Sequence, residues 1–208
     1  MRISEIFFSI QGESIYSGLP CVFVRVAGCN LKCSYCDTKH DVDNAEEFTP
    51  KEILDVVNTF THTYLVEITG GEPLLYDDVY ELIELLHHAG FKVLIETNGS
   101  LDLKKIPDYV CKIVDVKTAG SGHGDSFLVS NLSYINPVKD NLKFVLCDMN
   151  DYEWMKEFLK KHDLYGSHVL VSTVFTWKEG MNMVCTQVLE DGLDVRFQLQ
   201  MHKYIGLR

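Results

Sequence analysis

Short apolar runs alternate with amphipathic segments along most of the chain. The apolar runs, which are typical of buried strands, lie at residues 21–28, 64–69, 92–97, 112–117, 143–146, 168–175 and 195–200. Apolar residues at helical spacing predict helices at residues 49–60, 77–90, 151–162 and 180–192. Strands that are separated by crossover helices form a parallel sheet, so the pattern predicts an α/β fold.

The number of predicted strands narrows the kind of α/β fold. A complete eight-stranded α/β barrel takes about 250 residues, whereas this chain has 208 residues and its pattern predicts about seven strands. We therefore expect an incomplete, open parallel α/β barrel, formed as a single domain by residues 1–208. In such sheets, ligands bind at the carboxyl ends of the strands.

Polar motifs lie at that end of five predicted strands. They are AGCNLKCSYCDT (27–38), TGGEP (69–73), ETNG (96–99), DVK (115–117) and STVF (172–175). Any one of them has an ordinary interpretation as a turn or loop, because Gly, Pro, Asn and Asp favour turns. Since all five fall at one edge of the predicted sheet, together they predict a functional site there.

Composition and charge exclude several classes of partner. Hydrophobic residues make up 46% of the chain and charged residues 24%, as in ordinary globular proteins. No apolar run is long enough to cross a bilayer, and acidic residues interrupt the N-terminal apolar patch, unlike in a signal peptide. We therefore expect a cytoplasmic protein that does not enter membranes. The net charge of −11 argues against a nucleic-acid partner, which needs a basic surface.

The seven cysteines fall into two groups. An odd number in a cytoplasmic protein argues against a disulfide framework. Four lie in apolar segments, where we expect them to be small buried hydrophobic residues: Cys21, Cys111, Cys147 and Cys185. The remaining three share one loop: Cys29, Cys33 and Cys36.

Three thiols in one loop leave three interpretations open. A structural zinc site needs four ligands, and His40 is a candidate for the fourth. A ferredoxin-type cluster needs four thiolates at a different spacing. A cubane iron–sulfur cluster with only three thiolates would leave one iron open to an outside ligand. Gly28, just before the first cysteine, permits the close backbone approach that such a loop needs.

The cysteine loop resembles the signature of radical S-adenosylmethionine (SAM) enzymes. Its Cys-x-x-x-Cys-x-x-Cys spacing, with Tyr35 before the last cysteine, and the Gly-Gly-Glu of TGGEP (69–73) carry the resemblance. The resemblance implies a partial α/β barrel and a 4Fe–4S cluster whose open iron binds SAM. It also implies that the reduced cluster cleaves SAM to a 5′-deoxyadenosyl radical.

Further segments resemble one family within this superfamily, the 7-carboxy-7-deazaguanine synthases of queuosine and 7-deazapurine biosynthesis. They are EIFFSIQGES (5–14), GLPCVFVRVAGCNLKCSYCDT (18–38), EITGGEPLL (67–75), ETNGS (96–100) and FQLQMHKYIGLR (197–208). The resemblance implies a lyase that converts 6-carboxy-5,6,7,8-tetrahydropterin to 7-carboxy-7-deazaguanine with loss of ammonia. It further implies catalytic use of SAM, a Mg²⁺ ion, a reductant such as flavodoxin or ferredoxin, and a homodimer.

The resemblance also implies residue roles. The cluster ligands are Cys29, Cys33 and Cys36, and the Mg²⁺ contact is Thr38. The SAM contacts are Tyr35, Asp37, Gly71, Glu72, Glu96, Asn98, Asp115, Lys117, Ser172, Val174 and Phe175. The substrate contacts are Ile10, Gln11, Gly12, Glu13, Arg25, Thr69, His202 and Arg208.

Arg25 illustrates how each of these roles competes with an ordinary one. It lies in an apolar strand, where an unpaired charge is costly. It is either a bidentate clamp on the substrate carboxylate or the partner of a buried acid such as Glu67. In the same way, the His202 segment is either a cover for the substrate or a solvated tail.

Two other functions compete with the synthase. An activase of glycyl-radical enzymes also carries a three-cysteine loop, but it acts on a protein and needs neither a Gln-Gly-Glu segment for a pterin nor a His-Lys tail. A zinc-binding module without catalysis would need only the cysteine loop and His40. It leaves the gathering of the other motifs at one edge of the sheet unexplained.

Overall fold

The fold is one mixed sheet with helices on its outer side. The computed structural model describes residues 1–36, 38, 44–166 and 168–207. Within this part of the chain the sheet has nine strands in the order β3-β1-β2-β4-β5-β6-β7-β8-β9. The strands are β1 (Arg2–Ile10), β2 (Pro20–Val26), β3 (Glu46–Glu47), β4 (Leu65–Gly70), β5 (Lys92–Thr97), β6 (Cys111–Asp115), β7 (Asn141–Leu146), β8 (Val169–Thr173) and β9 (Arg196–Phe197).

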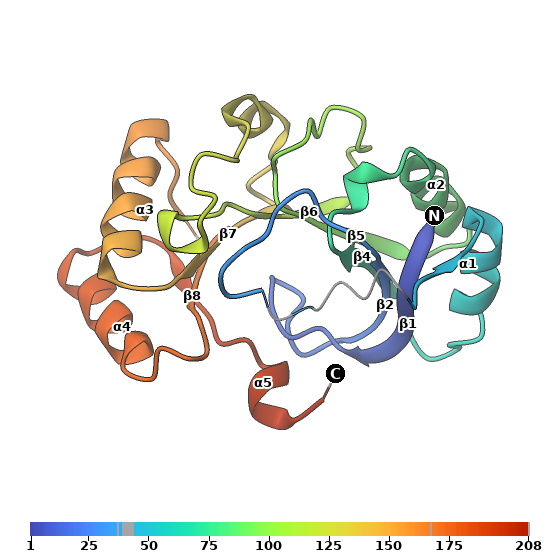
Figure 1. Ribbon diagram of the computed structural model, residues 1–208, viewed down its shortest axis with the longest axis horizontal. Helices are drawn as coiled ribbons and strands as arrows, with labels where there is room; N and C mark the ends of the chain where they lie inside the picture. Colours follow the sequence, from blue (N-terminus) through green and yellow to red (C-terminus); the bar gives the residue numbers. More distant parts are fainter. Residues whose placement is uncertain (37, 39–43, 167, 208) are drawn as a thin grey trace.

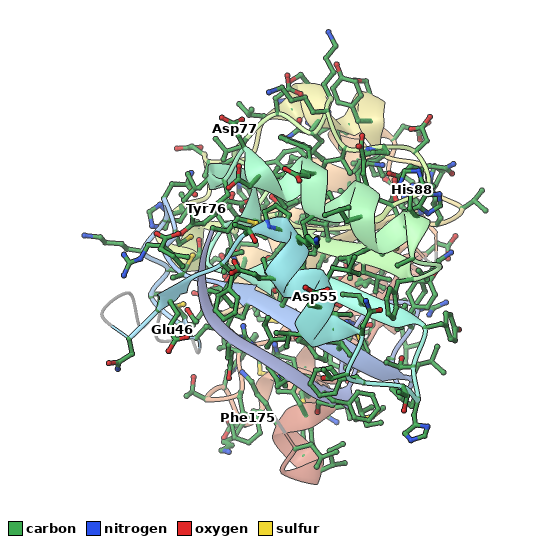
Figure 2. The ribbon with its side chains drawn as sticks, turned by 90° about the vertical axis from the view of Figure 1, so that its right-hand side faces the viewer. Glu46, Asp55, Tyr76, Asp77, His88 and Phe175 are labelled. Carbon is green, nitrogen blue, oxygen red and sulfur yellow. The ribbon has the colours of Figure 1, made fainter. Side chains whose placement is uncertain are left out.

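Four long helices cover the outer side of the curved sheet (Figure 1). The α-helices are α1 (Pro50–Val57), α2 (Asp78–His88), α3 (Met149–His162), α4 (Gly180–Glu190) and the short α5 (His202–Ile205). The 3₁₀ segments are η1 (Pro73–Leu75), η2 (Ala119–Ser121) and η3 (Val129–Tyr134). Thr49 and Glu52 form a capping box that starts α1. Figure 2 shows α1 and α2 side by side over the outer face of the sheet.

The seven predicted strands are correct, with ends that differ by a few residues. From β2 to β9 every neighbouring pair is parallel, and the sheet stays open, which confirms the incomplete barrel. The pattern missed β1, which pairs antiparallel with β2. In β1 only Ile3 is fully buried, and polar residues interrupt its apolar run, so neither alternation nor a continuous apolar stretch marks it as a strand.

Alternation within the strands separates a helix-packed face from an inner face. On β4, Val66 and Ile68 pack under the helices, whereas Leu65 belongs to a second apolar cluster on the other side. Glu67 shares the inner face with Leu65 because side chains two residues apart point the same way. The second cluster consists of Cys21, Phe23, Leu65, Leu94, Cys111 and Ile113 with Phe7 and Tyr16 against it. This cluster forms an apolar floor inside the open barrel.

Within the described residues, no helix reaches both the length and the apolar character that crossing a bilayer requires.

The turn before β7 is held by a buried charge. Asp140 is fully buried and accepts hydrogen bonds from Nζ of Lys112 at 2.9 Å and Nζ of Lys139 at 2.7 Å. Its carboxylate also accepts the backbone N–H groups of Lys112 and Asn136, each at 2.9 Å. These contacts fix the start of β7 beside β6.

We expect Asp140→Ala to lower the free energy of unfolding by about 3–5 kcal/mol, because it leaves the Lys112 charge buried without its carboxylate. Urea unfolding of the two proteins measures the difference. Asp77→Ala is the control, since the Asp77 side chain is 96% exposed and its loss should change stability by no more than about 0.5 kcal/mol. Equal losses of unfolding free energy in both variants would contradict the stabilising role of the buried Asp140 carboxylate.

Candidate active site

The carboxyl ends of the parallel strands surround a cavity of about 1080 Å³. Its wall is formed by the segment after β1, the cysteine loop, the ends of β4 to β7, the segment after β8 and the region of α5. Ligand pockets commonly measure about 300–1,000 Å³, so this cavity has room for more than one small molecule. The predicted location of the site at this edge of the sheet is therefore correct.

The cysteine loop is fastened to the end of β4 by backbone contacts. The N–H of Gly71 donates to the carbonyl of Val26 at 3.1 Å, and the N–H of Glu72 donates to the carbonyl of Gly28 at 2.9 Å. A Cβ atom at Gly71 would overlap the carbonyl oxygen of Gly28. Only glycine therefore allows the two backbones to approach this closely.

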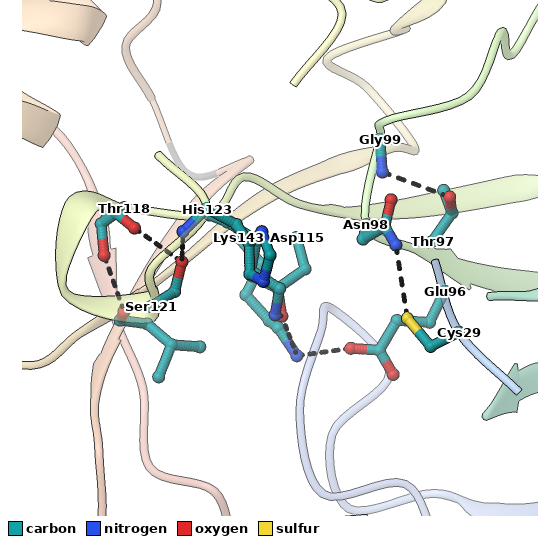
Figure 3. A network of polar contacts seen from close by, with 12 residues as sticks. Cys29, Glu96, Thr97, Asn98, Gly99, Asp115, Thr118, Ser121, His123 and Lys143 are labelled. Atoms are coloured by element: carbon teal, nitrogen blue, oxygen red, sulfur yellow. Dashed lines mark hydrogen bonds and ion pairs between the residues drawn. The ribbon is translucent and has the colours of Figure 1, made fainter. Parts of the chain in front are cut away.

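Two further strand ends hold the same loop. Near β5, Nδ2 of Asn98 donates to Oδ1 of Asn30 at 3.0 Å and to Sγ of Cys29 at 3.7 Å (Figure 3). Near β6, Ser34 donates its N–H to the carbonyl of Ser121 at 3.0 Å and its hydroxyl to the carbonyl of Gly120 at 2.7 Å. The loop has no regular secondary structure of its own and depends on these neighbours.

The loop presents the side chains of Cys29, Cys33 and Cys36 to the cavity. Burial raises the pKa of the Cys29 and Cys33 thiols, and a bound metal would deprotonate them. Across the described residues, no three His, Cys, Asp or Glu side chains converge as a mononuclear metal ion requires. Three thiols that do not converge fit a cluster in which each thiolate binds a different iron. His40 of the zinc interpretation lies outside the described residues.

Most predicted SAM contacts line the cavity, but not all. Those on its wall are Tyr35, Gly71, Glu96, Asn98, Asp115, Lys117, Val174 and Phe175. Asp37 lies outside the described residues. Ser172 is buried against a separate small cavity beside β9 and does not line the large one.

Glu72 also departs from its predicted position. It is fully buried behind the cavity wall. Its carboxylate accepts hydrogen bonds from the hydroxyl of Thr97 at 2.8 Å and from the N–H of Asn98 at 2.8 Å. It also accepts the N–H of Leu74 at 3.1 Å. Glu72 therefore ties the Gly-Gly turn to the end of β5 and positions Asn98.

Two buried polar atoms on the wall of the cavity have no hydrogen-bond partner among the residues that the structure describes. They are Oη of Tyr35 and Oδ1 of Asp115. Buried polar groups in proteins are nearly always paired. A ligand with several hydroxyl and amino groups, such as SAM, would supply partners to both.

Seven of the eight predicted substrate contacts also line the cavity. Those on the wall are Ile10, Gln11, Gly12, Glu13, Arg25, Thr69 and His202, while Arg208 lies outside the described residues. The N–H of Met201 donates to the carbonyl of Gly12 at 3.0 Å, and a Cβ atom at Gly12 would clash with the His202 ring. The C-terminal segment is therefore packed against the N-terminal one at Met201 and His202, whereas Tyr204, Ile205 and Leu207 are exposed.

Arg25 pairs with an acid, but not the one that the sequence suggested. Its Nε donates to Oε1 of Glu5 at 2.8 Å, across the β1–β2 pair. Its Nη1 donates to the hydroxyl of Thr38 at 3.3 Å. The suggested partner Glu67 instead accepts a hydrogen bond from Nε2 of Gln11 at 2.8 Å. Because β1 was not predicted as a strand, Glu5 could not be identified as the neighbour.

Sequence reasoning missed several residues of the cavity wall, among them Glu67, Lys143, Cys147 and Gln200. A charged residue inside a short apolar strand was the available signal for Glu67 and Lys143. Cys147 and Cys185 are half-buried, and Cys147 lines the cavity, so the expectation of fully buried thiols is confirmed only for Cys21 and Cys111.

Lys143 lies among three carboxylates on the floor of the cavity (Figure 3). Its Nζ is 2.8 Å from Oε2 of Glu13 and 3.6 Å from Oδ2 of Asp115, and it also contacts Oε1 of Glu96. Burial acts to lower the pKa of Lys143, but these carboxylates raise it well above its ordinary value. Burial acts to raise the pKa of Glu13 and of Asp115, but the neighbouring lysines hold both below their ordinary values.

The pKa of Glu67 is shifted in the opposite direction from those of Glu13 and Asp115. It is 2% exposed, and burial, together with the negative charge of Glu96, raises its pKa to about 8. Glu67 is therefore a neutral carboxylic acid at neutral pH. The cavity floor combines ionised carboxylates with one protonated carboxyl group.

We expect Glu67→Gln to remove a pH dependence of stability. In the unfolded chain Glu67 loses its proton near pH 4.5, whereas in the folded protein it keeps the proton up to about pH 8. Wild-type stability therefore falls as the pH rises between these values. The variant should gain stability relative to wild type across this window in urea unfolding. Glu81→Gln, on the exposed side of α2, should leave the slope unchanged, and equal slopes in all three proteins would contradict the assignment.

We expect Gly71→Ala to displace the cysteine loop. The added methyl group overlaps the Gly28 carbonyl, which should cost about 1–3 kcal/mol and lower the iron bound per chain after anaerobic reconstitution. Gly192→Ala is the control. Gly192 has a φ of 59° and open space around it, so its replacement should lower stability but leave the bound iron unchanged. Full iron loading of Gly71→Ala would contradict the role of this contact.

Comparison with known proteins identifies the family. The profile of the radical SAM superfamily matches residues 23–121. The 7-carboxy-7-deazaguanine synthase of Koribacter versatilis (strain Ellin345) is 43% identical over 219 residues, which cover 99% of this chain and 96% of the relative. The synthase of Chlorobaculum tepidum is 38% identical over 99% of this chain and 94% of the relative. The synthase of Methanospirillum hungatei JF-1 is 36% identical over 210 residues, which cover 100% of this chain and 86% of the relative.

Solved structures share the fold. The crystal structure of QueE from Escherichia coli aligns with a TM-score of 0.76 and 23% sequence identity, over 95% of this chain and 93% of that chain. Streptococcus suis SuiB bound to S-adenosylmethionine aligns with a TM-score of 0.57 and 16% identity, over 81% of this chain and 47% of that chain. The synthases of Koribacter versatilis and Chlorobaculum tepidum match 99% of this chain at 43% and 38% identity. The chain therefore belongs to the 7-carboxy-7-deazaguanine synthase family of the radical SAM superfamily.

Proposed function

We propose that the protein converts 6-carboxy-5,6,7,8-tetrahydropterin to 7-carboxy-7-deazaguanine with loss of ammonia. One observation carries the proposal. A single cavity is lined by the three thiols of the cysteine loop, by a Gln-Gly-Glu segment and by an arginine. Such a cavity brings a redox cofactor and a polar ring substrate into contact. When bound, the 4Fe–4S cluster and SAM supply a 5′-deoxyadenosyl radical that takes a hydrogen atom from the substrate and later returns one.

The residues on the cysteine side hold and orient the cofactors. Cys29, Cys33 and Cys36 would bind three irons of the cluster. Gly71 leaves space for close approach at the loop, and Asn98 holds Cys29 through its amide. Tyr35 and Asp115 offer their unpaired oxygens to SAM. Because these groups are fixed by strand ends, they need little rearrangement when the cofactors bind.

Arg25, the Gln-Gly-Glu segment and His202 recognise the substrate. The guanidinium of Arg25 matches a carboxylate in bidentate geometry, and the carboxylate of 6-carboxytetrahydropterin is its proposed partner. Gln11 and Glu13 supply the amide and carboxylate groups that a pterin edge would bind. The side chain of Gln11 is held at both ends, by the N–H of Glu13 at 2.6 Å and by Glu67 at 2.8 Å. His202 and the residues around it cover the cavity and exclude water.

The metal, the assembly and the reductant belong to the same proposal. We propose a Mg²⁺ ion shared between Thr38, water and the substrate carboxylate, and Arg25, whose Nη1 lies 3.3 Å from the Thr38 hydroxyl, would contact the same carboxylate. We also propose that the protein acts as a homodimer in the cytoplasm with a flavodoxin- or ferredoxin-type reductant. Family membership supports these three points.

The test is anaerobic turnover of the reconstituted protein with SAM, dithionite, Mg²⁺ and 6-carboxytetrahydropterin. Mass spectrometry should detect 7-carboxy-7-deazaguanine over many turnovers, without consumption of SAM in proportion. Cys33→Ser should lose the cluster and all activity, because it removes one of the three thiolates. Cys185→Ser is the matched control, since Cys185 does not line the cavity and its replacement should leave turnover unchanged.

Other outcomes would favour the competing functions. A brown protein that cleaves SAM but makes no deazaguanine would favour the activase of glycyl-radical enzymes and sink the pterin substrate. A colourless protein that holds one Zn²⁺ and ignores SAM would favour the binding module and sink the enzymatic proposal altogether.

A further inference from the structure

The mechanism above gives no role to Lys143, the buried cation at the centre of the cavity floor. The side chain of Lys143 is 5% exposed, and it extends from β7 into the open barrel rather than toward the helices. Its ammonium group contacts Glu13, Glu96 and Asp115. Figure 3 shows it between the carboxylates of Glu96 and Asp115.

The three carboxylates come from different parts of the chain. Glu13, a predicted substrate contact, follows β1, and Asp115, a predicted SAM contact, ends β6. Glu96, another predicted SAM contact, lies on β5 and also accepts a hydrogen bond from the hydroxyl of Thr69 at 3.0 Å. Lys143 therefore contacts residues that are predicted for both ligands.

The charges around Lys143 do not balance without it. Titratable and charged groups face it from the segment after β1, from β4, β5 and β6, and from α5: Glu13, Glu67, Glu96, Asp115, Lys117 and His202. Lys117 is already paired with Asp115 at 2.8 Å. If Lys143 were removed, Glu13, whose side chain is 13% exposed, would lose its lysine partner, which favours uptake of a proton by this carboxylate.

Protonation of Glu13 would change what the cavity can bind. The 2-amino-4-oxo edge of a pterin presents N–H donors, and an ionised carboxylate accepts from them, whereas a carboxylic acid has its own hydrogen to donate. Gln200 donates to Glu13 at 2.9 Å, so one oxygen of Glu13 is held by the C-terminal segment and the other by Lys143. The ammonium group thus fixes both the charge and the direction of this carboxylate.

We propose that Lys143 is a positioning residue that keeps Glu13 ionised and aimed at the N–H edge of the substrate, and that links it to Glu96 and Asp115 among the SAM contacts. The proposal deepens the proposed function and rests on it for the identity of the substrate. The requirement for a buried cation at this place rests on the contacts of Lys143 alone.

The first experiment measures binding of 6-carboxypterin, an aromatic and unreactive relative of the substrate, to the reconstituted protein with SAM across neutral pH. Wild type should bind with an affinity that changes little with pH. Lys143→Met should bind at least tenfold more weakly at neutral pH, and its Kd should rise further by about tenfold per pH unit below a new apparent pKa. Lys143→Arg should restore most of the affinity and remove the new pH dependence.

Lys112→Met is the matched control. Lys112 is also a buried lysine paired with a carboxylate, on the neighbouring strand β6, but it does not line the cavity. Its replacement should lower stability and leave the Kd and its pH dependence as in wild type. A Kd for Lys143→Met equal to wild type, or weakened by the same factor at every pH, would overturn the proposal, because either result leaves the ionisation of the carboxylates unaffected by Lys143.

A second measurement needs no ligand. In a Glu67→Gln background, which removes the carboxyl group already protonated, Lys143→Met should show an additional infrared carbonyl band of a carboxylic acid as the pH falls through neutrality. Circular dichroism confirms that the variant is folded. Absence of the band would overturn the proposal even if the synthase activity is established. A band in the variant, combined with no pterin binding by wild type, would keep the positioning role and reject the substrate.

Discussion

Opposite charges inside the open barrel hold the cavity together. Lys143 and Lys117 neutralise Glu13, Glu96 and Asp115 at a place where water has little access. Buried charges are tolerated only when they are paired and hydrogen-bonded. Each carboxylate comes from a different segment. The contacts that neutralise the carboxylates therefore also hold these segments together around the cavity. The apolar floor beneath keeps this polar layer at the carboxyl ends of the strands.

The cysteine loop depends on the sheet in a different way. It has no regular structure, and its shape comes from hydrogen bonds to residues at the ends of β4, β5 and β6. At Gly71 the backbones lie so close together that a Cβ atom would overlap the carbonyl oxygen of Gly28. Glu72 then ties the glycine turn to Thr97 and Asn98, so a displacement at one strand end would reach the thiols. The cofactor side of the cavity is thus positioned by the same strands that carry the charged network.

Much of the site could be predicted because strand ends and motifs coincide in the sequence. The parallel strands were predicted correctly since each is a short apolar run, and the carboxyl ends of parallel strands share one edge. The prediction failed for β1, whose residues are mostly half-buried. It therefore missed Glu5 as the partner of Arg25. Glu72 matched a motif, yet its side chain points into a buried hydrogen-bond network behind the wall.

The sequence by itself determined the class of fold, the three thiols and the family, because these depend on local periodicity and on short motifs with fixed spacing. Only the tertiary structure decided which charged side chains meet. Lys143 and Glu13 are 130 residues apart along the chain, and no local pattern links them. Likewise, Gln200 reaches Glu13 across 187 residues. Side-chain pairing of this kind depends on sheet order and on strand register, which local propensities do not specify.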